Sequence, residues 1–214
     1  MTKNDTKTTQ YIRSNLCPDA GLCALEKYAA ENSVPVVLPE SAAFLRQLIM
    51  LKQPQKVLEI GLGIGYSGHI ILQSSNAHLF TTELEQRRID VAKEFFTHSG
   101  LINRVTFYAG DEAVIIPEIS GQFDFIFLDG AKNKYIKHLP YLKKLLIKGG
   151  VLLADNVLFG GMVAGETEVV KAKSTIVQGL RAFVDAICKD KNFYTSIIPV
   201  GDGMSVSIKL GTND

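Results

Sequence analysis

Short apolar runs alternate with longer amphipathic segments over most of the chain. Five runs have the length and composition of buried strands, and they are Lys56–Ile60, His78–Thr82, Val105–Tyr108, Phe123–Leu128 and Val151–Ala154. Between them, Gln86–Gly100 and Lys132–Lys148 carry apolar residues at helical spacing. Strands that alternate with helix-length connections pair in parallel, so the pattern predicts an α/β fold with helices on both faces of a parallel sheet.

The pattern changes near the C-terminal end. After a last long helix, Thr175–Lys189, two apolar runs follow as Tyr194–Val200 and Met204–Leu210, with only Gly201-Asp202-Gly203 between them. A connection this short permits only a hairpin, so the last strand must run antiparallel to its neighbour. We therefore predict a seven-stranded mixed sheet with an antiparallel last strand.

The N-terminal part of the chain predicts extra helices before the sheet. These are Leu22–Asn32 and Glu40–Leu51, on either side of a loop that Pro35 and Pro39 keep extended. With 214 residues and 46% hydrophobic content, the chain fits one domain. We divide this single domain, 1–214, into an N-terminal helical segment (1–52) and a core that carries the sheet (53–214).

Composition argues against several classes of protein. A net charge of +1, from 23 basic and 22 acidic residues, gives no global sign of a nucleic-acid or membrane binder. No apolar run approaches the ~20 residues that span a bilayer, and residues 1–15 lack the apolar centre of a secretory signal, so we expect a cytoplasmic protein with no membrane partner. Cys17, Cys23 and Cys188 lack metal-binding spacing and are expected to be reduced and mostly buried.

A glycine-rich segment, Gly63-Ile-Gly65-Tyr-Ser-Gly68, follows the first strand. It matches a nucleotide-binding pattern, but such a match is weak by itself and is also compatible with a structural turn. Glu59 lies two residues before the first glycine, Gly61, and a carboxylate there favours a ligand with ammonium and sulfonium groups over a pyrophosphate. Glu83 ends the second strand, where it could accept hydrogen bonds from ribose hydroxyls. Asp111 ends the third, where it could contact an adenine amino group or cap the next helix.

Oxygen-bearing side chains follow the next two strands. Asp129 comes directly after the fourth, and Asp155 with Asn156 comes after the fifth. Because the carboxyl ends of parallel strands meet at one edge of a sheet, we expect these side chains to lie together beside the glycines. Hard oxygen ligands suit Mg²⁺, Mn²⁺ or Ca²⁺, and ordinary capping by aspartate is the alternative. Lys132 lies three residues after Asp129 and would stand beside such a metal.

With these motifs assembled, the chain resembles the metal-dependent O-methyltransferases related to catechol and caffeoyl-CoA methyltransferases. The resemblance runs from about Pro35 to the end and is carried by VLEIGLGIGYSG, FDFIFLDGAKNKY, LLADNVLFGG and IIPVGDGMSVSIK. It implies a Rossmann-like fold, S-adenosylmethionine (SAM) as methyl donor, and Mg²⁺, or Mn²⁺ or Ca²⁺, on Asp129, Asp155 and Asn156. It also implies that Lys132 and Asp129 act at the acceptor hydroxyl. The cofactor-binding residues it implies are Val36, Glu59, Gly61, Gly65, Tyr66, Ser67, Glu83, Asp111, Ala113 and Asp129.

Two classes of acceptor are compatible with these residues. Within the family, DNVLFGGMVAG and IIPVGDG look most like bacterial enzymes that methylate 5-hydroxyuridine at the tRNA wobble position to give 5-methoxyuridine. Candidates for phosphate contacts with tRNA are Arg87, Lys134, Lys171 and Lys173. A small catechol or caffeoyl-CoA-type acceptor is the alternative, and it would use the same catalytic residues. Family members commonly form homodimers, and we expect one here.

A rival from another class is an NAD-dependent or non-catalytic nucleotide-binding protein built on the same glycine-rich segment. Such a protein would need neither the cluster of oxygen ligands nor the reversed last strand. The predicted metal cluster and hairpin therefore favour the methyltransferase.

Overall fold

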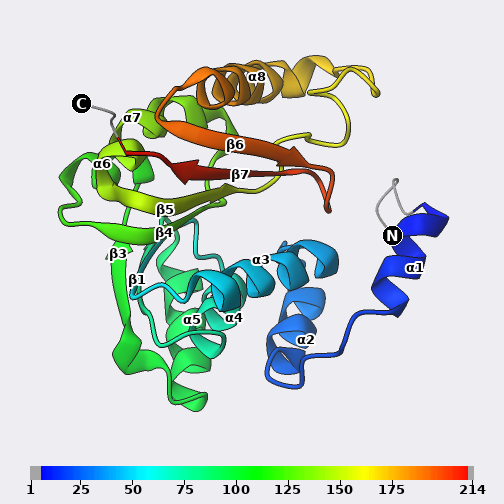
Figure 1. Cartoon of the computed structure of the whole chain (residues 1–214). Coiled ribbons are helices and arrows are strands. Elements are labelled where there is room, and N and C mark those ends of the chain that lie inside the picture. The colour runs from blue at the N-terminus through cyan, green and yellow to red at the C-terminus, as the bar shows by residue number, and fades with distance from the viewer. Residues whose placement is uncertain (1–5, 212–214) are drawn as a thin grey trace.

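The strands lie close to the positions that the apolar runs predict. The computed structural model describes residues 6–211, so the first five residues of the polar N-terminal segment and the last three residues of the chain lie outside it. Its sheet has seven strands in the order β3-β2-β1-β4-β5-β7-β6 (Figure 1). Their bounds are β1 (Lys56–Ile60), β2 (His78–Glu83), β3 (Val105–Ala109), β4 (Phe123–Leu128), β5 (Leu146–Ala154), β6 (Phe193–Ile198) and β7 (Met204–Lys209).

The predicted mixed sheet is confirmed. Strands β1 to β5 pair in parallel, whereas β7 runs antiparallel to both β5 and β6. The reversal is made by Gly201-Asp202-Gly203, whose two glycines have φ of +59° and +84°. The parallel strands therefore place their carboxyl ends along one edge of the sheet.

Different helices cover the two faces of the sheet (Figure 1). One apolar core packs α2 (Cys23–Glu31), α3 (Pro39–Lys52), α4 (Tyr66–Gln73) and α5 (Gln86–His98) against one face. The other core packs α6 (Glu112–Glu118), α7 (Tyr135–Leu145) and α8 (Ser174–Lys189) against the opposite face. The described helices also include α1 (Lys7–Ser14) and three short 3-10 turns, η1 (Ile102–Arg104), η2 (Lys132–Lys134) and η3 (Lys171–Lys173).

The structure corrects three details of the prediction. The helix expected over Lys132–Lys148 is a 3-10 turn followed by α7, which ends at Leu145 because Leu146 already pairs with Phe123 in the sheet. Helix α1, which has no buried residue, was not predicted. The three cysteines are free as expected, but all three side chains are exposed instead of buried, because they lie on outward-facing parts of the N-terminal segment and α8.

None of the helices within residues 6–211 combines the length and apolar character needed to cross a membrane.

Candidate active site

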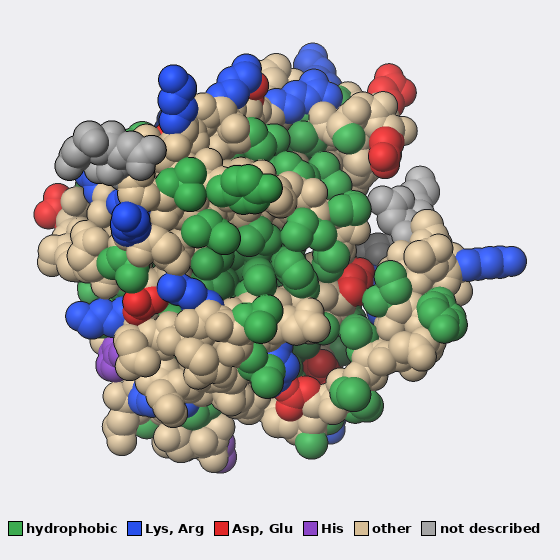
Figure 2. Space-filling view, in the orientation of Figure 1, with side chains coloured by type: hydrophobic (Ala, Val, Ile, Leu, Met, Phe, Trp, Pro, Cys, Tyr) green, Lys and Arg blue, Asp and Glu red, His purple; other side chains and the backbone are tan. Residues whose placement is uncertain are grey.

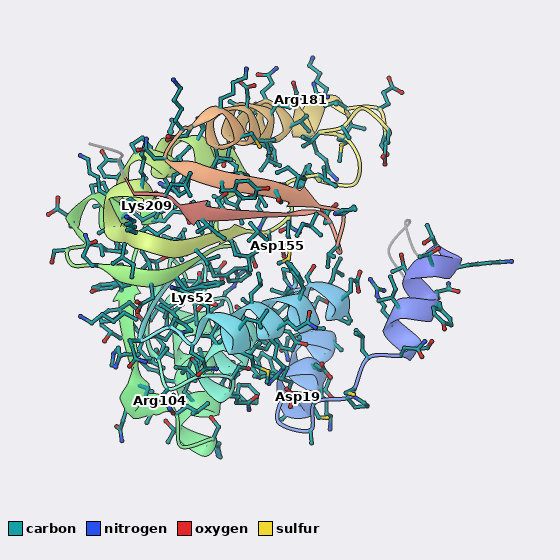
Figure 3. The ribbon with its side chains drawn as sticks, viewed as in Figure 1. Asp19, Lys52, Arg104, Asp155, Arg181 and Lys209 are labelled. Carbon is teal, nitrogen blue, oxygen red and sulfur yellow. The ribbon has the colours of Figure 1, made fainter. Side chains whose placement is uncertain are left out.

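A cavity of about 410 Å³ lies at the carboxyl edge of the parallel strands. Its wall combines the segment before α3 with the loops that follow strands β1 to β5. Figure 3 places Asp155 between the strands of the sheet and the N-terminal helices. The predicted site residues that line the cavity are Val36, Gly61, Tyr66, Ser67, Glu83, Asp111, Asp129, Lys132, Asp155 and Asn156.

Three predicted cofactor-binding residues lie behind this wall. Gly65 is the N-cap of α4, where a Cβ would lie 3.0 Å from the Phe96 ring. The amide of Ala113 donates to Asp111, which caps α6. Glu59 is fully buried at the end of β1. Gly65 and Ala113 therefore shape the loops around the cavity, and Glu59 acts from beneath it.

The glycine-rich segment packs its main chain directly against the main chain at the end of β4. Gly61 has φ of +93°, and a Cβ on it would lie 2.6 Å from the carbonyl oxygen of Asp129. Left-handed backbone of this kind is costly for other residues, so glycine is required here on two grounds. The close approach keeps the first glycine turn in contact with the end of β4.

Glu83 is held in place by three main-chain amides. Its Oε2 accepts from Gly63 N at 2.9 Å, and its Oε1 accepts from Leu84 N and Glu85 N at 2.9 and 3.0 Å. The carboxylate thus ties the glycine-rich segment to the end of β2 while facing the cavity. Its position suits the predicted contact with ribose hydroxyls.

Glu59 reaches the cavity through another side chain. Ser67 Oγ donates to Glu59 Oε1 at 2.5 Å, and Thr81 Oγ1 donates to Oε2 at 2.9 Å. Burial raises the pKa of Glu59 to about 8. Because Ser67 lines the cavity, this carboxyl group orients a wall residue, and its predicted direct contact with the donor stays a prediction.

The raised pKa predicts a pH-dependent stability. From the ordinary pKa of 4.5 up to about 8, folded Glu59 keeps a proton that the unfolded chain releases. The contribution of Glu59 to the free energy of unfolding should therefore fall as pH rises through this window, by at most about 1.4 kcal/mol per pH unit. Urea unfolding of the cofactor-free protein at pH 6 and pH 8 should show a smaller fall in Glu59→Gln than in the wild type. Glu94→Gln, on the exposed face of α5, is the control, and equal pH slopes in wild type and E59Q would refute the assignment.

The candidate metal ligands follow two paired strand ends. Asp129 N donates to Ile60 O at 2.9 Å, and Asp155 N donates to Leu128 O at 3.1 Å. Asn156 has φ of +59° and donates its main-chain N–H to Asp155 Oδ1 at 2.7 Å. Lys132 Nζ donates to Asp129 Oδ1 at 2.6 Å. The sequence therefore brings the two carboxylates, one amide and one ammonium group to the same part of the wall.

The electrostatics of this group favour an added cation. Burial raises the pKa of Asp129, and burial together with the charge of Asp129 raises the pKa of Asp155 to about 7. Within the described chain, no three His, Cys, Asp or Glu side chains gather as a metal cluster, so a metal here would need the Asn156 amide as third ligand. Two carboxylates and an amide are the hard oxygen donors that Mg²⁺ accepts.

Two residues of the wall, Glu112 and Lys134, were not predicted as part of the donor site. Glu112 Oε1 accepts from Ala131 N at 3.1 Å and lies 3.2 Å from His138 Nε2, so it joins α6 to the loop after β4. Lys134, predicted as a phosphate contact, donates to Asp111 Oδ1 at 2.8 Å. The sequence carries no local signal for either contact, because each joins segments about 20 residues apart.

Comparison with known proteins decides the family. A family model described as O-methyltransferase matches residues 21–210. The chain belongs to the O-methyltransferase family. This methyltransferase is 31% identical over 173 residues to catechol O-methyltransferase of Niastella koreensis, which covers 77% of this chain and 76% of that protein. It is 26% identical to caffeoyl-CoA O-methyltransferase 1 of Arabidopsis thaliana, over 80% of this chain and 70% of that one.

Solved structures agree with this family. The O-methyltransferase from Bacillus cereus in complex with S-adenosylhomocysteine (SAH) has a TM-score of 0.82 at 25% identity, covering 95% of this chain and 97% of that one. TomG from Streptomyces achromogenes, in complex with SAM, has a TM-score of 0.82 at 25% identity, covering 94% and 95%. The predicted SAM-dependent O-methyltransferase activity and fold are confirmed, and the NAD-dependent alternative does not fit this family.

Proposed function

We propose that this enzyme transfers a methyl group from SAM to one oxygen of a vicinal oxygen pair, with Mg²⁺ held by Asp129, Asp155 and Asn156. The observation that carries the proposal is the carboxylate pair on the cavity wall, with Asp155 buried and 20% of the Asp129 side chain exposed, beside Glu83 and the glycine turn. Donor and acceptor would then meet at one edge of the sheet.

On the donor side, the chain offers a preformed cradle. Glu83, fixed by three amides, would accept from the ribose hydroxyls, and the main chain at Gly61 lies open to close approach. Ser67, oriented by Glu59, would contact the amino-acid part of SAM. Asp111 remains the candidate for the adenine amino group, although it already caps α6 and pairs with Lys134.

On the acceptor side, the cation and Lys132 would activate and orient the acceptor hydroxyl. When bound, the cation would lower the pKa of the acceptor hydroxyl and fix its position for in-line attack. Lys132, anchored to Asp129, would position the acceptor oxygen, and its role as a base stays the alternative. The methyl group passes from sulfur to oxygen, the hydroxyl proton is released, and SAH is the second product.

The names of the relatives favour a small acceptor. Catechol and caffeoyl-CoA appear in the names of proteins similar to this chain over most of its length. A cation held by Asp129 and Asp155 would bind two neighbouring oxygens, which a catechol supplies. We therefore place a catechol-type acceptor first.

The predicted tRNA acceptor is the second candidate. It is supported by exposed basic residues, which are Arg87, next to the wall residue Arg88, and the pair Lys171 and Lys173 on η3, and by a cavity wall to which residues 157–167 do not contribute. Lys134 supports it less, since its ammonium group pairs with Asp111. 5-Hydroxyuridine also offers vicinal oxygens, at its 5-hydroxyl and 4-carbonyl groups.

The test compares acceptors directly. We expect labelled SAM with Mg²⁺ to methylate a catechol, to leave the matching monophenol unmodified, and to lose activity with EDTA. Methylation of the monophenol at the same rate, or full activity in EDTA, would refute the vicinal metal site. Methylation of 5-hydroxyuridine-containing tRNA without methylation of the catechol would assign the second candidate, and tRNA affinity should then weaken as salt is added.

The expected homodimer stays a prediction. It is supported by an apolar face on β6 and β7, where Tyr194 and Ile208 pair in register with 67% and 41% of their surface exposed. Figure 2 shows hydrophobic side chains gathered over these strands. An apolar face of this kind is a common interface between copies of a chain.

A further inference from the structure

Tyr135 is a fully buried residue at the start of α7 that the mechanism above does not use. We propose that it is a positioning residue whose hydroxyl holds the ends of β4 and β5 together, and thereby sets the separation of the Asp129 and Asp155 carboxylates. The inference rests on the metal site proposed above, and it adds a residue outside the predicted ligand set.

The hydroxyl lies between the two strand ends. Tyr135 Oη donates its single proton to Leu128 O at 2.9 Å, and Asp155 O, at 3.3 Å, shares that proton as a weaker second acceptor. Leu128 is the last residue of β4 and directly precedes Asp129. Asp155 directly follows the last residue of β5. One side chain therefore contacts the main chain at, or next to, both carboxylate ligands.

This position matters because regular strand pairing stops there. The last register pair between β4 and β5 is Leu128 with Ala154, and Asp155 N to Leu128 O is the next main-chain bond. Beyond it the two segments enter separate loops. The Asp129 and Asp155 carboxylates repel each other when both are charged, so an added tie at this point resists their separation.

Packing fixes the direction of the hydroxyl. The Tyr135 ring meets Phe183 of α8 edge-on, with centroids 5.4 Å apart and planes at 74°. Both rings are fully buried in the core that includes α7 and α8. Phenylalanine at position 135 would keep this ring contact and remove only the hydroxyl.

A buried tyrosine could instead serve stability alone, so the readout must separate the two roles. A purely structural hydroxyl would change the melting temperature without changing metal affinity. Thr195→Val is a matched control, because Thr195 Oγ1 donates to Ile187 O at 3.2 Å and also hydrogen-bonds Ser207 Oγ on the β6–β7 side of the sheet. That variant loses a partly buried hydroxyl that has no contact with the ligands.

Mn²⁺ binding to the full chain, followed by electron paramagnetic resonance of the free ion, tests the inference. We expect Tyr135→Phe to weaken Mn²⁺ binding about 10-fold or more, since partners that orient metal ligands usually contribute about 10- to 100-fold. SAH affinity measured by calorimetry should stay unchanged, and T195V should bind both ligands normally. Wild-type Mn²⁺ affinity in Y135F would overturn the inference and leave the proposed function standing.

Two further outcomes are defined. If Y135F also loses SAH binding, its fold is disturbed, and Phe183→Leu then decides by loosening the ring while keeping the hydroxyl. A weaker Mn²⁺ affinity in F183L with normal SAH binding supports the inference, and an unchanged affinity overturns it. If the wild-type chain binds no Mn²⁺, the proposed metal site fails, and the role of Tyr135 fails with it.

Discussion

Asp155→Ala should abolish methyl transfer while SAH still binds with wild-type affinity. Loss of residues that merely orient metal ligands costs about 10- to 100-fold, so loss of a ligand should lower kcat/KM by more than about 100-fold. The donor contacts proposed for Glu83 and Gly61 lie on other strand ends and should survive. Turnover with a catechol and calorimetry with SAH measure the two effects separately.

Misfolding is not expected to explain this loss. The Asp155 side chain is almost fully buried, and burial with the nearby Asp129 charge raises its pKa to about 7, so its ionised form is disfavoured in the metal-free protein. Removing that carboxylate relieves a repulsion within the folded chain, which offsets the loss of the hydrogen bond from Asn156 N. The melting temperature of metal-free D155A should therefore not fall along with its activity.

Asp124→Ala supplies the control. Asp124 belongs to β4, but its carboxylate accepts from Gln55 N and Lys56 N at the opposite edge of the sheet, at 2.9 and 2.8 Å. D124A should lose some stability and keep its turnover. Loss of SAH binding in D155A would mean that Asp155 belongs to the donor site, and full activity in D155A would exclude it as a metal ligand.

Much of the fold could be predicted because the spacing of apolar residues and the length of a turn are both local properties of the sequence. The start and end of β1 and β4 match the apolar runs, and the short connection forces the reversed β7, although β6 ends at Ile198 and the connection has five residues instead of the three expected. The start of β5 could not be predicted in the same way. Leu146 fits an amphipathic helix as well as a strand, and its pairing with Phe123 decides between them.

The residues of the candidate site could likewise be predicted only where a local sequence pattern places them. Strand ends placed Glu83, Asp129 and Asp155 on one edge of the sheet, because alternation of strands and helices is visible in the sequence. The direction of a side chain is not visible there, so the burial of Glu59 behind Ser67 came only from the structure. The role of Tyr135 could not be predicted for a related reason. Its hydroxyl contacts main-chain carbonyl oxygens, which every residue has, so the sequence does not indicate its partners.

Gly61→Ala should both destabilise the protein and abolish donor binding. At φ of +93°, a side chain strains the backbone, and its Cβ would lie 2.6 Å from Asp129 O, an atom of another segment that cannot swing away. Backbone strain of about 1–3 kcal/mol and a steric cost of similar size should lower the free energy of unfolding by about 2–6 kcal/mol. Urea unfolding measures this, and calorimetry measures the loss of SAH affinity.

Gly121→Ala separates the two causes. Gly121 has φ of +102°, close to that of Gly61, but nothing lies within 4 Å of a Cβ added there. G121A should therefore lower the free energy of unfolding only by the backbone strain and should bind SAH normally. G61A should lower it by both the strain and the steric cost, and it should also shift the end of β4 that precedes Asp129. Equal losses of stability in the two variants would show that the main chain at Asp129 moves away from the added Cβ at little cost. Wild-type SAH affinity in G61A would place the donor away from the first glycine turn, because a displacement of this turn against the end of β4 would then leave the donor contacts intact.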